Sequence, residues 1–297
     1  MEKKTLLKME KKILLVEKVT NLEYHQAKGN PKFRRRHEEK MIHLLRDHKR
    51  HNEFTGKLVK ILDTSGADFD RHKSDKIENI NYANYSMIIT SGGDGTFLKA
   101  AENINGQTIV GMNSTYSSSN EGSAGGLTII DKRNLYEIRR IFTGDYRLEE
   151  WRRLYASING RKIDDLAVND IYVGHPKGYK SSHLEVIIEH EGDSFVSSGA
   201  IFSTGMGSHA WFRSAGGTQF KNELDLFGII IREPFEKKEK YKFSSRILSE
   251  KEKVAIYPER DDYVVVFDSK DKEYSIATED YVTIGLSEKS INVIRFD

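Results

Sequence analysis

A glycine-rich pentapeptide in the first third of the sequence carries one carboxylate, and this combination indicates phosphate chemistry. Gly92-Gly93-Asp94-Gly95-Thr96 lies between an apolar run and a helical pattern. Glycines adopt positive φ and let backbone N–H groups approach a ligand, and a helix N-terminus favours negative charge. Phosphates would repel Asp94, so we expect this side chain to face a hydroxyl group or a bound Mg²⁺. The alternative is a tight turn capped by Asp94 or Thr96.

This loop fits neither of two common phosphate-binding patterns. The P-loop requires a Lys-Ser/Thr pair after its last glycine, and the dinucleotide fingerprint requires G-x-G-x-x-G. Residues 92–96 have neither feature. The loop alone therefore does not identify the ligand.

A second stretch, residues 197–217, is rich in serine and glycine and could form the wall of a ligand site. Its centre, residues 203–211, reads STGMGSHAW. Small residues leave room for a ligand, hydroxyl groups supply hydrogen bonds, and Trp211 offers a flat face for a base or a nicotinamide-like ring. The alternative is a buried place where two segments of the chain cross closely through small residues, with Trp211 in the core.

The glycine loop lies within an alternation of strands and helices. Apolar runs predict strands over residues 13–20, 87–90 and 108–113, and apolar residues three or four apart predict an amphipathic helix over residues 37–62. Strands that alternate with helices indicate a doubly wound parallel sheet, in which ligands bind at the carboxyl ends of the strands. Residues 92–96 follow one such end.

After Tyr146 the pattern changes to short strands separated by polar turns, as at residues 184–189, 263–267 and 281–285. We therefore predict an α/β protein with two domains. Residues 1–146 would form a doubly wound parallel sheet that carries the glycine loop, and residues 147–297 a β-rich, sandwich-like domain. The final apolar run, residues 291–296, could pack back on the first domain.

Composition excludes several classes of protein. The 297 residues hold no cysteine, which excludes disulfides, thiolate metal sites and thiol catalysis. No stretch approaches the roughly 20 apolar residues of a membrane span. The first eight residues carry charges where a signal peptide needs an apolar segment. We therefore expect a soluble, cytoplasmic protein with no membrane partner.

Charge is distributed unevenly along the chain. Residues 1–60 carry 17 Lys and Arg against 8 Asp and Glu, a balance of +9. The net charge of the whole chain is +2, so the remaining residues carry a net charge of −7. Such a basic head, with Arg34-Arg35-Arg36 as its densest part, could contact a polyanion such as the phosphates of ATP. The solvated basic face of a long helix is the favoured explanation, and we expect no nucleic-acid partner.

The glycine-rich stretches, in this order, resemble the NAD kinase family. The markers of that family are a G-G-D-G-T loop, an Ala-x-Asn-Glu step, and a Ser-Thr-x-x-Gly-Ser-x-Ala-Tyr stretch followed by Ser-x-Gly-Gly. They correspond here to residues 92–96, 167–170, 203–211 and 214–217. The features more similar to the branch that contains the mitochondrial animal enzyme are Asn113, Asn120-Glu121-Gly122, Ser-Ser-Gly at 197–199, Gly205 and Trp211.

The resemblance implies a reaction, an NAD kinase-like fold and a homo-oligomer. The reaction is the ATP-dependent phosphorylation of the adenosine-ribose 2′-hydroxyl of NAD to NADP, with small-molecule nucleotides as partners. Asp94 would be the catalytic residue that orients this hydroxyl and accepts its proton late in phosphoryl transfer. Mg²⁺ would be held mainly by ATP phosphates and water, without a dedicated protein metal site. The residues implied to bind nucleotide are Gly93, Gly95, Thr96, Asn113, Glu121, Asn169, Asp170, Ser198, Ser208, His209, Ala210, Trp211 and Ser214.

Three of these positions depart from the usual family pattern. Asp170 is one methylene shorter than the usual glutamate, Ser198 stands where many members have an aspartate, and His209 replaces a threonine. We expect these differences to affect the choice of substrate, including NAD against NADH, more than the catalytic step.

Two other functions share some of these features. A lipid or sugar kinase could carry the same G-G-D-G-T loop, although a lipid kinase needs an apolar entrance that residues 197–217 do not suggest. A non-catalytic nucleotide sensor would bind NAD without turning it over. Formation of NADP distinguishes both from an NAD kinase.

Overall fold

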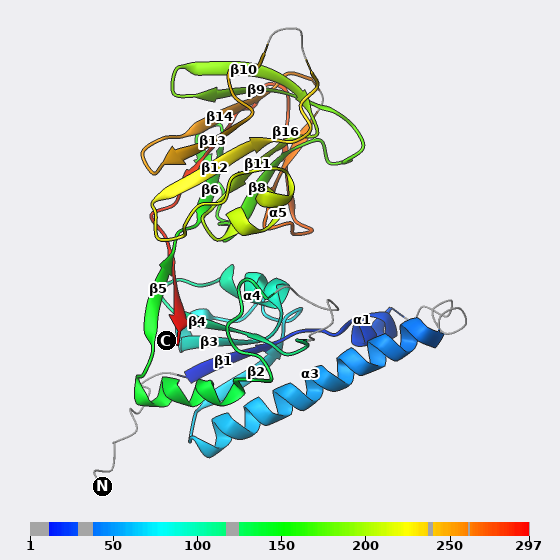
Figure 1. Cartoon of the computed structure of the whole chain (residues 1–297), viewed down its shortest axis with the longest axis vertical. Helices are drawn as coiled ribbons and strands as arrows, with labels where there is room; N and C mark the ends of the chain where they lie inside the picture. The colour runs from blue at the N-terminus through cyan, green and yellow to red at the C-terminus, as the bar shows by residue number, and fades with distance from the viewer. Residues whose placement is uncertain (1–11, 29–37, 117–124, 237–239, 261, 297) are drawn as a thin grey trace. The chain divides into compact units, whose positions relative to one another are not determined.

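The computed structural model describes residues 12–28, 38–116, 125–236, 240–260 and 262–296. The chain divides into two compact units (Figure 1). Unit 1 comprises Met1–Glu149 and Ile291–Asp297, and unit 2 comprises Glu150–Ser290. Among the described residues, no helix is long and apolar enough to cross a membrane.

Unit 1 is built on a six-stranded sheet with the order β2-β1-β3-β4-β18-β5. Its strands are β1 (Lys12–Glu17), β2 (Phe69–Lys73), β3 (Tyr85–Gly92), β4 (Thr108–Asn113), β5 (Arg147–Trp151) and β18 (Ile291–Arg295). The pairs β1–β2, β1–β3, β3–β4 and β4–β18 are parallel. The last strand in the sequence, β18, therefore lies between β4 and β5 in this sheet.

Helices pack on the sheet of unit 1 because their apolar stripes match its buried strands. The helical elements are α1 (Asn21–Ala27), α3 (Glu38–Thr64), η1 (Tyr82–Asn84), α4 (Asp94–Ala101) and η2 (Leu135–Thr143). Phe54, Leu58 and Leu62 of α3 share one apolar cluster with Leu15 and Ile89 of the strands. The predicted helix over residues 37–62 is thus confirmed as one continuous helix.

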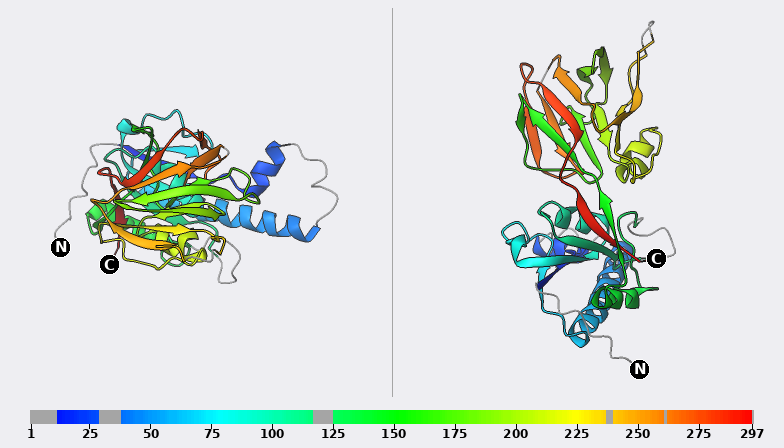
Figure 2. Two further views of the ribbon diagram at one scale, coloured as in Figure 1. Left: turned by 90° about the horizontal axis from the view of Figure 1, so that it is seen from above. Right: turned by 90° about the vertical axis from the view of Figure 1, so that its left-hand side faces the viewer.

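Unit 2 is a sandwich of two six-stranded sheets (Figure 2). One has the order β10-β9-β14-β17-β6-β7, and the other β13-β12-β11-β8-β15-β16. The first sheet comprises β6 (Leu154–Ile158), β7 (Arg161–Lys162), β9 (Ser182–Ile188), β10 (Glu191–Ser197), β14 (Val254–Pro258) and β17 (Val282–Leu286). The second comprises β8 (Asp170–Gly174), β11 (Ala200–Ser203), β12 (Leu226–Ile231), β13 (Ser245–Ser249), β15 (Tyr263–Phe267) and β16 (Glu273–Ile276).

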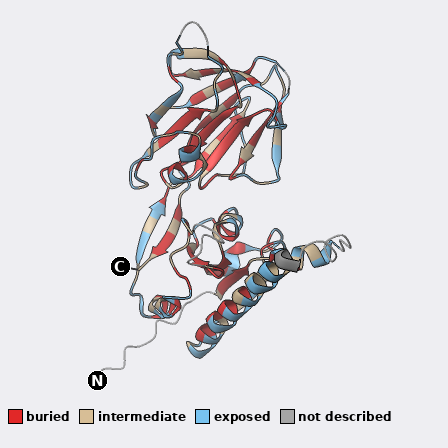
Figure 3. Ribbon diagram, turned by 45° about the vertical axis from the view of Figure 1, so that its right-hand side comes forward, coloured by how far each residue is buried: buried red, intermediate tan, exposed pale blue. Residues whose placement is uncertain are grey.

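Alternating side chains from both sheets form the core of unit 2. Val186 and Ile284 of one sheet and Phe202 and Val265 of the other belong to the same apolar cluster. Figure 3 shows these central strands in the colour of buried residues. The predicted fold class, a parallel α/β sheet followed by a β-rich sandwich, is confirmed.

Candidate functional site

The glycine loop connects β3 to α4 in a tight turn that requires small residues. β3 ends at Gly92, Gly93 is extended, with φ −147° and ψ −166°, and α4 begins at Asp94. A Cβ atom on Gly92 would lie 2.1 Å from the Thr96 Oγ1 atom and 2.6 Å from its Cβ, so a larger residue does not fit there. A Cβ atom on Gly95 would have no atom within 4 Å. The loop therefore packs tightly against Thr96 of its own helix at Gly92, while the space beside Gly95 is empty of protein atoms from the described residues.

The Asp94 carboxylate is held by a neighbouring segment of unit 1. Its Oδ1 atom accepts a hydrogen bond from the Leu127 N–H at 3.0 Å, and its Oδ2 atom accepts one from the Gly126 N–H at 3.1 Å. The side chain is half-buried. These two donors fix the plane of the carboxylate, which is the property required of a group that must orient a substrate hydroxyl.

The end of β4 closes the other side of the loop. Asn113 is the register partner of Gly92, and its buried side chain accepts a hydrogen bond from the Thr115 N–H at 3.2 Å. The Ser114 N–H donates to the Gly92 carbonyl oxygen at 2.8 Å. Gly93, Asp94, Gly95, Thr96 and Asn113 thus gather at the carboxyl edge of the sheet. Glu121 and Arg34–Arg36 lie outside the described residues.

A buried histidine that was not among the predicted residues supports this edge. His51 of α3 is 0% exposed, and its Nδ1 atom lies 2.8 Å from the Ser114 Oγ atom. Burial, aided by the positive charges of Lys73 and Lys18, lowers the pKa of His51 to about 3. The imidazole is therefore neutral at neutral pH. The only signal in the sequence is that His51 is seven residues before Leu58, on the apolar face of the helix.

In unit 2, Asn169 and Asp170 stand at the start of β8. The Oδ1 atoms of both side chains are buried without a hydrogen-bond partner among the described residues. Burial, with the nearby charge of Asp268, raises the pKa of Asp170 to about 8. Asp170 is therefore mainly a neutral acid at pH 7. Two buried oxygens without partners are available for a bound ligand, because unsatisfied buried polar atoms are costly.

A further buried carboxylate, Asp268, organises this segment and was missed from the sequence. It accepts hydrogen bonds from the N–H groups of Val168, Asn169 and Asp170 at 3.0, 2.7 and 3.2 Å. Burial raises its pKa, while Lys270 and these donors favour the ionised form. We take Asp170 to hold the proton and Asp268 the charge, because Asp268 has the donors that a carboxylate needs.

The stretch over residues 203–211 is packed against the same segment. The Thr204 hydroxyl donates to the Val168 carbonyl oxygen at 2.6 Å, and a Cβ on Gly207 would lie 2.0 Å from the Asn169 carbonyl oxygen. Ser208 is buried, and its hydroxyl donates to the Gly205 carbonyl oxygen at 2.7 Å. The structure thus brings Asn169, Asp170 and Ser208 together. The Ser208 hydroxyl is used in a hydrogen bond within its own segment.

The remaining predicted residues of unit 2 lie near Trp211 in the sequence or contact its stacking partner Tyr172. The Trp211 ring stacks on Tyr172 with centroids 5.6 Å apart, and the Arg232 guanidinium lies 5.0 Å from the Trp211 centroid. The Tyr172 hydroxyl donates to the Ser198 carbonyl oxygen at 3.2 Å, although Ser198 lies at the other end of β11 from Ser203. The predicted residues on the exposed surface next to Trp211 are His209, Ala210 and Ser214.

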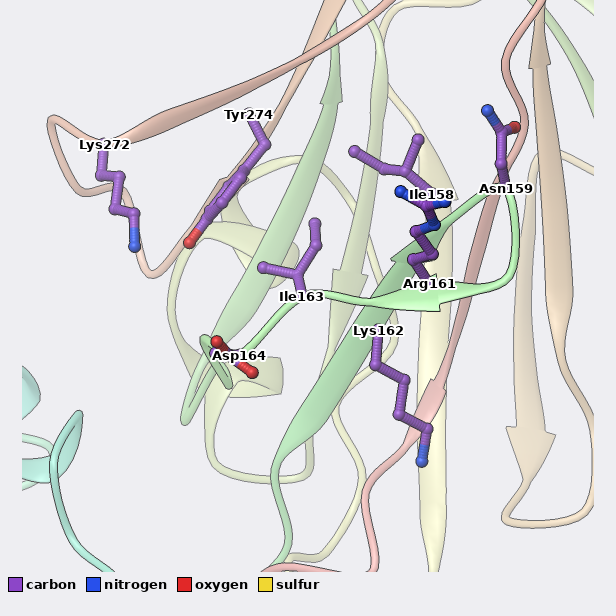
Figure 4. Close-up of a pocket in the computed structure, with 8 residues that line it drawn as sticks. All are labelled: Ile158, Asn159, Arg161, Lys162, Ile163, Asp164, Lys272 and Tyr274. Atoms are coloured by element: carbon purple, nitrogen blue, oxygen red, sulfur yellow. The ribbon is translucent and has the colours of Figure 1, made fainter.

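A separate cavity in unit 2 holds none of the predicted site residues. It measures about 820 Å³ and lies where the edge strands β7 and β16 approach (Figure 4). Arg161, Lys162 and Lys272 line it together with the ring of Tyr274. Within the described residues of either unit, no group of three or more His, Asp and Glu side chains could hold a metal ion.

Comparisons with known proteins give a consistent picture. Residues 168–296 match the family model described as the ATP-NAD kinase C-terminal domain. The NAD kinase of Thermoplasma volcanium is 27% identical over 248 residues, which cover 80% of this chain and 82% of that protein. The NAD kinase of Acetivibrio thermocellus is 31% identical over 163 residues, 51% of this chain and 54% of its own length.

A solved structure extends the similarity to the fold. The crystal structure of an NAD kinase from Archaeoglobus fulgidus in complex with ATP has a TM-score of 0.66 to this chain. The match has 20% sequence identity and covers 96% of this chain and 94% of that one. At this identity the match establishes a shared fold.

Proposed function

We propose that this chain is an NAD kinase, which transfers the terminal phosphoryl group of ATP to the adenosine-ribose 2′-hydroxyl of NAD, giving NADP. The observation that carries the proposal is the position of Asp94. It begins a helix at the carboxyl edge of a parallel sheet, and two backbone N–H groups hold its carboxylate. The relatives that match over about 80% of the chain support the same reaction.

Asp94 would act by positioning the hydroxyl group. An ordinary Asp, with a pKa of about 3.9, is too weak a base to remove a ribose proton in the ground state. Phosphoryl transfer passes through a loose transition state, so the carboxylate need only orient the nucleophile and accept its proton late. The N–H groups of Leu127 and Gly126 hold the two Asp94 oxygens in place, and a carboxylate oxygen can accept a hydrogen bond from a hydroxyl group in addition to one from an N–H group.

Asn169 and Asp170 would bind polar groups of the dinucleotide. Their Oδ1 atoms are buried and lack partners among the described residues. A neutral Asp170 can donate a hydrogen bond as well as accept one. Trp211 would contribute a flat face to the same ligand. Gly93, Gly95, Thr96, Asn113, Ser198, Ser208, His209, Ala210 and Ser214 remain proposed nucleotide contacts.

We propose ATP as the donor because the similar structure from Archaeoglobus fulgidus was solved in complex with ATP. Mg²⁺ would enter with ATP, held mainly by phosphate oxygens and water, since it prefers hard oxygen ligands and keeps several waters. When bound, it would neutralise charge on the transferred phosphoryl group. Asp94 is the carboxylate of the glycine loop that would face this end of the reaction.

Two finer assignments belong to the same proposal. Trp211, Gly205 and the Ser-Ser-Gly at 197–199 favour the branch that contains the mitochondrial animal enzyme. The family's habit favours a homo-oligomer, which sedimentation of the purified chain would measure. A monomer at all concentrations would contradict the latter assignment without affecting the reaction.

The direct test is incubation of the purified chain with ATP, Mg²⁺ and NAD, followed by an NADP-specific enzymatic assay. We expect NADP to accumulate with time and enzyme concentration. A parallel assay with NADH shows whether the reduced substrate is accepted. NAD binding without any NADP would point to a sensor, and phosphorylation of a sugar or lipid instead of NAD would point to another kinase of the G-G-D-G-T group.

A further inference from the structure

The strand order of unit 1 marks one place on the carboxyl edge of its sheet where a ligand is expected. The chain passes from β1 to β2 on one side of β1 and then returns past β1 to β3 on its other side. In open parallel sheets, ligands bind outside the carboxyl ends of strands at this kind of switch point. Here the two strands concerned are β1, which ends at Glu17, and β3, which ends at Gly92.

Lys18 is the first residue beyond β1 at this switch point. Glu17 is the register partner of Ser91, and the Lys18 N–H donates to the Ser91 carbonyl oxygen at 2.9 Å. Lys18 therefore lies beside Gly92, at the start of the glycine loop. The helix α4, which begins in this loop, contacts β1 as well as β3 and β4.

The ammonium group of Lys18 has no ion pair or hydrogen bond with any residue that the structure describes. Its neighbours are matched with each other, since Lys73 pairs with Glu23 at 3.0 Å and Arg71 pairs with Glu17 at 2.7 Å. Lys18 is also half-buried, and this burial lowers its pKa, against the attraction of Asp47 and Glu23. A desolvated cation without a partner is costly, so the site favours an anionic ligand.

A second polar group at this edge also lacks a partner. The Nε2 atom of His51 is buried and makes no hydrogen bond to the described residues, while its Nδ1 atom contacts Ser114. The Ser114 N–H in turn binds the Gly92 carbonyl oxygen. Because the imidazole is neutral, it does not neutralise an anion itself. Lys18 therefore contributes a positive charge beside the loop that forms no ion pair with the described residues.

We propose that Lys18 binds a phosphate group of the donor nucleotide. A P-loop carries its lysine directly after its last glycine, where the side chain reaches the β- and γ-phosphates. The loop at residues 92–96 has no such lysine, and Lys18 supplies the charge from the adjacent strand instead. This assignment rests on the proposed function only in taking ATP as the donor.

The test compares Lys18→Met with Lys18→Arg and with Lys76→Met, a control that removes an exposed lysine after β2. Binding of Mg²⁺ with a non-hydrolysable ATP analogue is measured by calorimetry, and NAD binding is measured separately. We expect Lys18→Met to weaken analogue binding at least tenfold, since a charge-assisted contact is lost. Lys18→Arg should stay within about threefold and Lys76→Met within twofold. NAD binding should be unchanged in all three variants.

Inorganic tripolyphosphate, used as a competitor, separates a phosphate contact from a contact with the nucleoside. Its affinity should fall by the same factor as that of the analogue in Lys18→Met. Analogue binding within twofold of the wild type in Lys18→Met would overturn the proposal, as would a loss confined to NAD. Should Lys18→Met fail a thermal unfolding check, Lys18→Gln replaces it. NADP formation by the wild type tests the reaction independently of these binding measurements.

Discussion

The two units place aspartates in opposite surroundings. Asp94 of unit 1 is half-buried, and both of its oxygens accept backbone N–H groups. Asp170 of unit 2 is 3% exposed, has an oxygen without a partner, and has its pKa raised to about 8. The same side chain is therefore prepared for two tasks. In the proposed reaction, this difference in environment would make Asp94 the proton acceptor and Asp170 a neutral hydrogen-bonding group.

The strongest test of this contrast is Asp94→Asn. The amide keeps the size of the side chain but cannot accept the proton, so we expect turnover to fall about 10²–10⁴-fold. NAD binding should stay within about threefold. Steady-state kinetics and calorimetry measure the two effects, with Asp75→Asn, an exposed aspartate of unit 1, as the control. Unimpaired turnover in a folded Asp94→Asn protein would remove Asp94 from its proposed role.

In unit 2, Asp268→Ala should destabilise the fold. It removes the acceptor of three backbone N–H groups in a buried place. Since each unsatisfied buried donor costs about 1–3 kcal/mol, we expect a loss of at least about 3 kcal/mol of unfolding free energy. Asp271→Ala, an exposed change in the same turn, should be neutral. Equal urea midpoints for the two variants would show that Asp268 does not organise residues 168–170.

A pH series sharpens the contrast further. The pKa of Asp170 is raised in the folded state to about 8, so the folded protein holds a proton that the unfolded chain releases. This contribution to stability is complete below about pH 4, the ordinary Asp pKa, and is lost as the pH rises towards 8. Asp170→Asn should therefore show a flatter stability curve between pH 6.5 and 8. The difference in slope is at most about 1.4 kcal/mol per pH unit. Urea unfolding curves that stay parallel to those of the wild type would contradict the raised pKa.

His51 in unit 1 should give a dependence of opposite sign. Its pKa is lowered from 6.5 to about 3, so between these pH values the unfolded chain binds a proton at His51 and the folded protein does not. Stability from this group is complete above pH 6.5 and falls as the pH drops towards 3. In His51→Gln, the decline of stability between pH 6 and 4 should be shallower than in the wild type. His43→Gln, an exposed change on the same helix, should leave that slope as it is. A slope that His51→Gln leaves equally unchanged would mean that His51 is not held neutral by the fold.

Local patterns predicted the framework of unit 1 well. The runs at residues 87–90 and 108–113 correspond to β3 and β4, because a buried parallel strand needs an unbroken apolar run. The strand predicted over residues 13–20 ends at Glu17 in the structure, where the charged residues Glu17 and Lys18 already mark the edge. Chain direction and glycine content then place Asp94 at that edge.

Contacts between distant segments were beyond reach of these patterns. The donors to Asp94 come from Gly126 and Leu127, which no local pattern connects with the glycine loop. Asp268 lies about a hundred residues from the backbone that it organises, and in the sequence it is one aspartate in a polar turn. Roles assigned through the family resemblance, from Asn113 to Ser214, remain predictions that the variants above would examine.

The return of β18 to the sheet of unit 1 has a consequence for biosynthesis. Residues 291–295 fill the position between β4 and β5, yet the ribosome makes them only after all of residues 150–290. During translation, the sandwich of unit 2 can acquire its full complement of strands while the earlier sheet still has a gap between two of its members. The region that starts first is thus completed last, and a nascent chain halted before residue 291 would leave one backbone edge of β4 without its partner strand.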